Sequence, residues 1–231
     1  HTSTVLLIAN TNQIHIVSCT FRNLSRSAVS INRSLFIHFW KVLVQVIVIV
    51  IGGNDHDDKY NYSPILISMS RSLVISKCKF KSNQGRHGGV AKILSVISAN
   101  ISNCLFLLNY GRSGGALNIK KIWILNIFNS SFYGNKVTGE GGSILLRNID
   151  CIQIIATYFY LSRSEYNGGI MNICNCKYID MIDIYVKNNS ASKYDYQQHI
   201  IGTSVHKNRG VGGIFVNETR FLYVVSSTFE D

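Results

Sequence analysis

The stretch Cys104-Leu105-Phe106-Leu107-Leu108-Asn109, followed by Gly114-Gly115-Ala116-Leu117-Asn118-Ile119, decides the fold because the chain repeats it at a nearly constant interval. Most copies have an aromatic residue, an Asn three residues later and then a Gly-Gly pair. The landmarks are Phe80, Asn83, Gly88 and Gly89; Phe106, Asn109, Gly114 and Gly115; Phe132, Asn135, Gly141 and Gly142; Phe159, Gly168 and Gly169; and Tyr185, Asn188, Gly212 and Gly213. Successive aromatic landmarks are 26 or 27 residues apart, and a fixed period of this length indicates a solenoid.

The segments between the landmarks are short apolar runs such as Ile122-Trp123-Ile124-Leu125-Asn126-Ile127, which have the length and the β-branched content of strands. No such run can bury a face alone, but stacked rungs pair each strand with its copies about 4.8 Å above and below. We therefore predict an all-β, right-handed parallel β-helix in which residues 1–231 form one domain of about eight rungs, each with three strands and three turns. A leucine-rich repeat is disfavoured because its Leu spine is missing.

In-register stacking predicts three columns along the solenoid. The aromatic landmarks, including Tyr185, should form one interior column. The Asn landmarks, including Asn188, should hydrogen-bond along a second column or cap a turn. The Gly pairs should mark a corner where the backbone has a positive φ.

The regular repeats cover residues 78–231, whereas residues 1–77 are degenerate. We place a missing aromatic landmark near Ile47. The apolar segment 35–51 allows two interpretations, a buried strand rung or a membrane helix, and its 17 residues lie at the lower limit for a span. The rung is favoured because the repeat predicts one there. Membrane attachment, through this segment or through a longer parent protein, stays open.

Composition restricts the function less than the fold. The net charge is +11, but the basic residues are scattered along the sequence, so we expect no nucleic acid partner. With 12 acidic residues and no matched carboxylate pair of the kind glycoside hydrolysis needs, we predict no catalytic residue, no cofactor and no metal site. The densest group of hard-cation ligands is Asp55, Asp57 and Asp58, for which a solvated loop is the favoured interpretation.

Cysteines and glycosylation motifs complete the candidate features. Cys78 and Cys104 should stack on neighbouring rungs, and Cys151 and Cys176 are close enough in the repeat to be neighbours. Free thiols in the core are favoured, with disulfides between rungs as the alternative in an oxidising compartment. The motif Asn-x-Ser/Thr predicts glycosylation sites if the protein is secreted by a eukaryote. These sites are Asn23, Asn32, Asn61, Asn100, Asn129, Asn188 and Asn217.

The pattern of Phe106, Asn109 and Gly114-Gly115-Ala116-Leu117-Asn118-Ile119 resembles the repeats of chlamydial polymorphic membrane proteins and of surface proteins of protists such as trichomonads and ciliates. Ser162, in the Asn position of the fourth copy, departs from the pattern. The resemblance implies a right-handed parallel β-helix of the pectin-lyase-like group, displayed outside the cell and often used in adhesion.

We therefore expect a non-catalytic extracellular or cell-surface repeat protein that acts in adhesion or as a structural scaffold, with glycans or surface proteins as partners. The alternative is a carbohydrate-active β-helix, a lyase or glycoside hydrolase, that binds or cleaves an acidic polysaccharide. The insertion at residues 189–211 is the first place to look for contacts, because variable loops often carry function.

Overall fold

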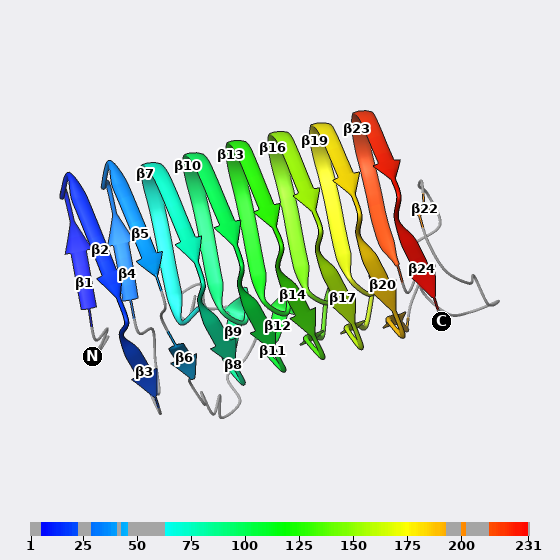
Figure 1. Cartoon of the computed structure of the whole chain (residues 1–231), viewed down its shortest axis with the longest axis horizontal. Coiled ribbons are helices and arrows are strands. Elements are labelled where there is room, and N and C mark those ends of the chain that lie inside the picture. The colour runs from blue at the N-terminus through cyan, green and yellow to red at the C-terminus, as the bar shows by residue number, and fades with distance from the viewer. Residues whose placement is uncertain are drawn as a thin grey trace, which may run out of the picture.

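The computed structural model describes residues 6–22, 29–40, 43–45, 63–192, 200–201 and 213–230. Within these residues every regular element is a strand, and the strands form three sheets wound as a parallel β-solenoid of about six turns (Figure 1). One short antiparallel pair, Ile200–Ile201 (β22) against β23, is the exception to the parallel pairing. The all-β solenoid expected from the repeat is therefore confirmed.

The largest sheet consists of long strands that stack in register along the solenoid axis (Figure 1). These strands are β7 (Ile65–Ser76), β10 (Ala91–Ser102), β13 (Leu117–Phe128), β16 (Ile144–Ile155), β19 (Met171–Ile182) and β23 (Ile214–Val225). The fifth residue of each strand has a φ between 51° and 56°, as at Lys121 and Asn148. This left-handed residue bends the strand, so the first four residues, the first limb, and the residues after the bend, the second limb, face different directions.

Two sheets of short strands complete each rung. The first contains β3 (Thr20–Arg22), β6 (Leu43–Gln45), β8 (Lys79–Lys81), β11 (Leu105–Leu107), β14 (Ser131–Tyr133), β17 (Tyr158–Tyr160), β20 (Tyr185–Lys187) and β24 (Thr228–Glu230). The second contains β9 (Gln84–His87), β12 (Tyr110–Ser113), β15 (Lys136–Val137), β18 (Arg163–Ser164) and β21 (Ser190–Ala191). Because the first has eight strands and the second only five, the expected count of about eight rungs stays a prediction.

A file of stacked phenylalanine rings runs through the core. Phe80, Phe106, Phe132 and Phe159 pair in register, and neighbouring ring centroids are 4.5–5.0 Å apart. All four side chains are at most 1% exposed, so like side chains stack over like, as the repeat predicts.

Tyr185 does not continue this column, and that prediction is wrong. Phe159 pairs with Val186, whereas Tyr185 pairs with Tyr158 on the outer face of the sheet. The positive-φ corner moves from Ala156 to Asp183, so this rung is one residue longer than the spacing of aromatic residues suggests.

The asparagine column is a continuous buried ladder. The Oδ1 atom of Asn109 accepts hydrogen bonds from both the backbone N and Nδ2 of Asn83, and Asn135 Oδ1 does the same for Asn109, all at 3.0 Å. The next rung carries Ser162, whose backbone N donates to Asn189 Oδ1 at 2.7 Å. The predicted member Asn188 is therefore wrong by one residue, because Asn188 occupies the positive-φ corner instead.

The two glycines of each pair have different roles. The first has a φ of 69–85° at Gly88, Gly114 and Gly141, a conformation that Gly adopts without a steric penalty. The second is required by close approach, because a Cβ on Gly115 would lie 2.0 Å from the carbonyl oxygen of Gly142 on the next rung. Gly213 is buried, and Gly212 lies outside the described residues.

The N-terminal rungs continue the same register despite their degenerate sequence. Here β1 (Leu6–Ala9) and β2 (Gln13–Val17) form the two limbs of one rung, and β4 (Val29–Asn32) and β5 (Phe36–Trp40) form those of the next. The described part of segment 35–51 consists of β5 and β6, so residues 36–40 and 43–45 belong to a rung.

The aromatic landmark placed near Ile47 is wrong, because Val44 pairs with both Phe21 and Phe80. Among the described residues no helix is long and apolar enough to cross a membrane.

Candidate functional site

Basic side chains gather on the outward face of the first limbs, beside the glycine corner. Lys120 and Arg147 pair directly in register on β13 and β16, and Lys92 lies one strand earlier on β10. The last residues of β9 and β12 add further basic groups at the edge of this face. We call this set the cationic cluster: Arg86, His87, Lys92, Arg112, Lys120 and Arg147.

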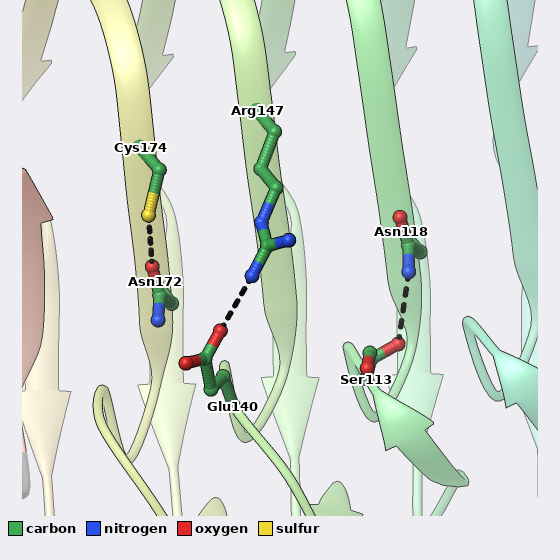
Figure 2. Close-up of polar contacts among 6 residues, drawn as sticks. All are labelled: Ser113, Asn118, Glu140, Arg147, Asn172 and Cys174. Carbon is green, nitrogen blue, oxygen red and sulfur yellow. Dashed lines mark hydrogen bonds and ion pairs between the residues drawn. The ribbon is translucent and has the colours of Figure 1, made fainter.

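One carboxylate lies within the cationic cluster. Arg147 extends along β16 toward the turn that follows β15, and its Nη2 atom is 2.7 Å from Oε2 of Glu140 (Figure 2). The side chains of Arg147 and Glu140 remain 40% and 34% exposed, so solvent reaches the pair. Among the described residues, no carboxylate forms an ion pair with Lys120. Positive charge therefore exceeds negative charge on this face.

The clustering of positive charge perturbs two members of the cationic cluster. Partial burial lowers the pKa of His87 to about 4, and the charges of Lys92, Lys120, Arg86 and Arg112 lower it further in that same direction. Burial is also the main cause of the lowered pKa of Lys120, followed by repulsion from Arg147 and Lys92. His87 is thus neutral at pH 7, while the surrounding lysine and arginine side chains carry a concentrated positive potential.

A layer of buried polar side chains supports the cluster from the neighbouring positions. Asn118 Nδ2 donates to the carbonyl oxygen of Ser113 at 3.4 Å, and the Cys174 thiol donates to Asn172 Oδ1 at 2.9 Å (Figure 2). Asn118 Oδ1, Asn172 Nδ2 and Arg147 Nε are buried without a hydrogen-bond partner. Such unsatisfied groups are uncommon in protein interiors, so this part of the surface has not been optimised for stability alone.

The arrangement favours binding over catalysis. Fixed cations on a rigid parallel sheet can hold an anionic ligand group. Acid–base cleavage of a glycan would need two facing carboxylates, and Glu140 is paired with Arg147. Within the described ranges no three His, Cys, Asp or Glu side chains come together as a metal-binding group. Asp55, Asp57 and Asp58 lie outside those ranges, as does most of the 189–211 insertion.

The cysteines have a structural position in the turns. All six are free thiols. Cys78 Sγ and Cys104 Sγ each donate to the carbonyl oxygen two residues earlier at 3.1 Å, and Ser130 and Thr157 make the same bond from equivalent positions at 2.9 Å. A hydrogen bond with Cys78 and burial raise the pKa of Cys104, so this thiol stays protonated and unreactive.

The suggested pairing of Cys151 with Cys176 is wrong. Cys151 pairs with Tyr178 and is exposed, whereas Cys176 is 2% exposed and belongs to the core. Burial raises the pKa of Cys176 to about 12. The two thiols therefore point to opposite sides of the sheet, where no disulfide can join them.

The glycosylation motifs differ in accessibility. Asn129 is exposed at a corner, where its Nδ2 atom donates to Asn103 Oδ1 at 2.8 Å. Asn32, Asn100, Asn188 and Asn217 are only partly exposed, and Asn23 and Asn61 lie outside the described residues. Glycosylation stays a prediction, and Asn129 is the site that a transferase would reach most easily.

The sequence analysis missed the cationic cluster because its members are far apart along the chain. Lys92, Lys120 and Arg147 read as scattered charges, yet each occupies the second or fourth position after the strand start. Aligning the repeats and reading them column by column would have revealed the cluster. The same reading would have found large exposed aromatic side chains on the second limbs, including Trp123, Phe221 and Tyr223, which are 59–66% exposed.

Comparison of this chain with protein-family models, with curated proteins and with solved structures finds no match. The fold defines the class, a parallel β-solenoid. The relation to polymorphic membrane protein repeats rests on the sequence motif alone.

Proposed function

We propose that this chain is a non-catalytic repeat protein of the cell surface or extracellular space that acts in adhesion, using the side faces of the solenoid to hold a partner. The proposal takes the winding as right-handed and the repeats as relatives of those in polymorphic membrane proteins, on the strength of the Phe-Asn-Gly-Gly motif. The partner is anionic. The observation that carries the proposal is the cationic cluster, which concentrates unbalanced positive charge on one face.

Two further features support a binding role. Exposed aromatic side chains such as Trp123 and Phe221 stand on the second limbs, and exposed aromatic residues mark interaction surfaces more often than bare structural faces. The stacked core also holds the outward side chains in fixed columns, because every long strand is paired along most of its length. A preorganised surface loses little entropy when it binds.

A glycan-array screen with anionic and neutral glycans tests the proposal, followed by lyase and hydrolase assays on every ligand that binds. We expect binding to anionic glycans without turnover, with an affinity that falls as salt is raised because exposed charges are screened. Turnover of a bound glycan would contradict the non-catalytic role, and binding that ignores glycan charge would contradict the role of the cationic cluster.

Two neighbouring lysines provide a matched pair of variants. Lys120→Asn removes a charge from the cationic cluster, and Asn217 shows that the fourth position of a long strand accepts Asn. Lys121→Asn removes the same charge from the adjacent corner, where Asn148 already adopts the required positive φ. Lys120→Asn should weaken anion binding about tenfold, while Lys121→Asn should leave it nearly unchanged. Equal losses would indicate attraction by net charge alone.

A further inference from the structure

A hollow lies at the bend of the N-terminal rungs because small residues replace large ones in one core column. The sixth position of the long strands is Val96, Ile122 and Ile149 in successive rungs, and all three side chains are buried. In the two preceding rungs this position is Ser34 and Ser70. A serine fills much less volume than a valine or isoleucine, so the surface is hollowed where the two limbs meet.

The hollow has the size and lining of a small-ligand site. Its volume is about 520 Å³, and it is lined by Arg33, Ser34, Leu35, Met69, Ser70, Arg71, Ser95 and Ile97. This volume falls in the range of known ligand pockets. Leu35, Met69 and Ile97 are 43–53% exposed, so they give the hollow an apolar wall that solvent can reach.

Arg33 and Arg71 supply positive charge at the rim. Their backbones are fixed by inter-rung hydrogen bonds, from Arg33 N to Ser68 O at 3.1 Å and from Arg71 N to Ser34 O at 3.3 Å. Neither guanidinium forms an ion pair with a carboxylate in the described part of the chain. Two guanidinium groups on adjacent rungs suit a carboxylate or sulfate, because the planar donor fork matches such oxygens.

The serine at the floor of the hollow needs a polar partner. The side chain of Ser34 is 1% exposed, and its hydroxyl has no hydrogen-bond partner. A buried hydroxyl without a partner costs about 1–3 kcal/mol. A purely apolar acid would satisfy the arginines and leave this hydroxyl unpaired, whereas a ring that carries hydroxyl groups would satisfy both.

We propose that the hollow lined by Arg33, Ser34 and Arg71 binds one acidic sugar residue, a uronate or a sulfated sugar, of a glycan on the partner surface. The arginines hold the anionic group, the serines bond to ring hydroxyls, and the carbon face of the ring packs against Leu35, Met69 and Ile97. This inference rests on the proposed adhesive function and adds a specific subsite that is separate from the cationic cluster.

Titration of the isotope-labelled chain with glucuronate, followed by NMR, tests the subsite. Glucose is the matched neutral sugar, glucose 6-sulfate tests the sulfated alternative, and inorganic sulfate tests the anion alone. We expect saturable shifts at Ser34, Ser70 and Arg71 with glucuronate or glucose 6-sulfate, at least about tenfold weaker binding of inorganic sulfate, and none with glucose. Equal affinity for inorganic sulfate would overturn the assignment to a sugar.

Two variants separate charge from shape. Arg71→Gln removes one rim charge, and Arg220→Gln makes the same change in the same column on β23, far from the hollow. Arg71→Gln should weaken glucuronate binding about tenfold, and Arg220→Gln should not. Ser34→Val fills the hollow with the residue type found at Val96, so it should abolish binding while stability stays equal or rises, because an unpaired buried hydroxyl is removed.

The outcomes distinguish failure of the subsite from failure of the proposed function. Glycan binding that depends on Lys120 but is unaffected by Ser34→Val and Arg71→Gln would overturn the subsite and leave the adhesive function standing. Loss of all anionic glycan binding in the unmodified chain would overturn both. Binding of single-stranded DNA at the same residues, stronger than that of any acidic sugar, would replace the glycan by a nucleic acid and also overturn the subsite.

Discussion

His87 shows at the scale of one residue that the cationic cluster works against folding at low pH. Its pKa of about 4 in the folded chain lies below the ordinary value of 6.5, so between these values the unfolded chain binds more protons. Stability therefore rises with pH across this window, is complete above about pH 6.5, and is lost as pH falls toward 4. The groups that face His87 are Lys92, Lys120, Arg86 and Arg112.

We expect His87→Ser, which copies the paired residue Ser113, to lose less stability than the unmodified chain between pH 7 and pH 4.5 in urea unfolding. Lys120→Asn should raise the pKa of His87 in an NMR titration because one repelling charge is removed, whereas Lys121→Asn should not. An unchanged pH dependence in the serine variant would show that other groups control the acid sensitivity.

Two glycines predict opposite responses to substitution. A Cβ on Gly115 would meet the backbone oxygen of Gly142, which cannot move without breaking the stack, whereas a Cβ on Gly134 would meet only the end of the Leu108 side chain. Leu108, Leu161 and Asn188 already take the positive φ of the Gly134 corner. Gly115→Ala should therefore destabilise the protein by about 3 kcal/mol or more, and Gly134→Asn by less than about 1 kcal/mol. Equal unfolding midpoints in urea would contradict this explanation of the Gly pair.

At the scale of the element, the asparagine ladder joins one rung to the next through buried polar bonds. Asn135 Oδ1 accepts from Asn109 twice, and Asn135 Nδ2 donates to the carbonyl oxygen of Phe106 at 3.0 Å. Asn135→Ala removes these bonds in a dry core and should cost about 3 kcal/mol or more in free energy of unfolding. Asn135→Ser, the residue type at Ser162, should cost less because a hydroxyl can still bond within the ladder.

The control for the ladder lies on the outer face of the same rungs. Asn126 Nδ2 donates to Asn100 Oδ1 at 2.7 Å where both side chains are partly exposed. Asn126→Ala should change the free energy of unfolding by less than about 1 kcal/mol, because water replaces the lost partner. If the two alanine variants unfold at the same urea concentration, burial does not decide the value of the ladder.

Elements with a fixed spacing could be predicted from the sequence, and those set by side-chain direction could not. Phe80, Phe106 and Phe132 are 26 residues apart, so their stacking follows from the period. Tyr185 kept the same spacing from Phe159, yet the rung had gained a residue, and only the inward position of Val186 reveals the shift. The bends at Met69, Lys121 and Glu218 left no signal, because these residue types rarely take a positive φ and stacking imposes it.

The candidate sites were harder to predict for the same reason. The cationic cluster joins Lys92, Lys120 and Arg147 through the register of three strands, and the hollow at Ser34 and Ser70 exists only relative to Val96 in the same column. Both depend on how one rung differs from its neighbours. A motif search looks for what the rungs share, so it detects the scaffold and passes over the sites.

At the scale of the whole molecule, a solenoid that is held together by contacts between neighbouring rungs should tolerate the removal of one complete rung. Leu117 pairs with Ile144, so deleting residues 117–143 joins Ala116 to Ile144 at equivalent points of the repeat. The deletion would place β10 against β16 and bring Phe106 over Phe159 in the core. Gly115 would then approach Gly169, as Gly142 does now.

We expect the shortened chain to keep its β-sheet circular dichroism and to unfold cooperatively, with a smaller dependence on denaturant because less surface is buried. Deleting half a rung, residues 117–129, should instead abolish the fold, since short strands would meet long ones and inward side chains would turn outward. Because the complete deletion removes Lys120 but leaves Ser34 and Arg71, it should weaken binding at the cationic cluster and preserve glucuronate binding in the hollow. A folded half-rung deletion, or an unfolded complete one, would show that the contacts between rungs are not interchangeable.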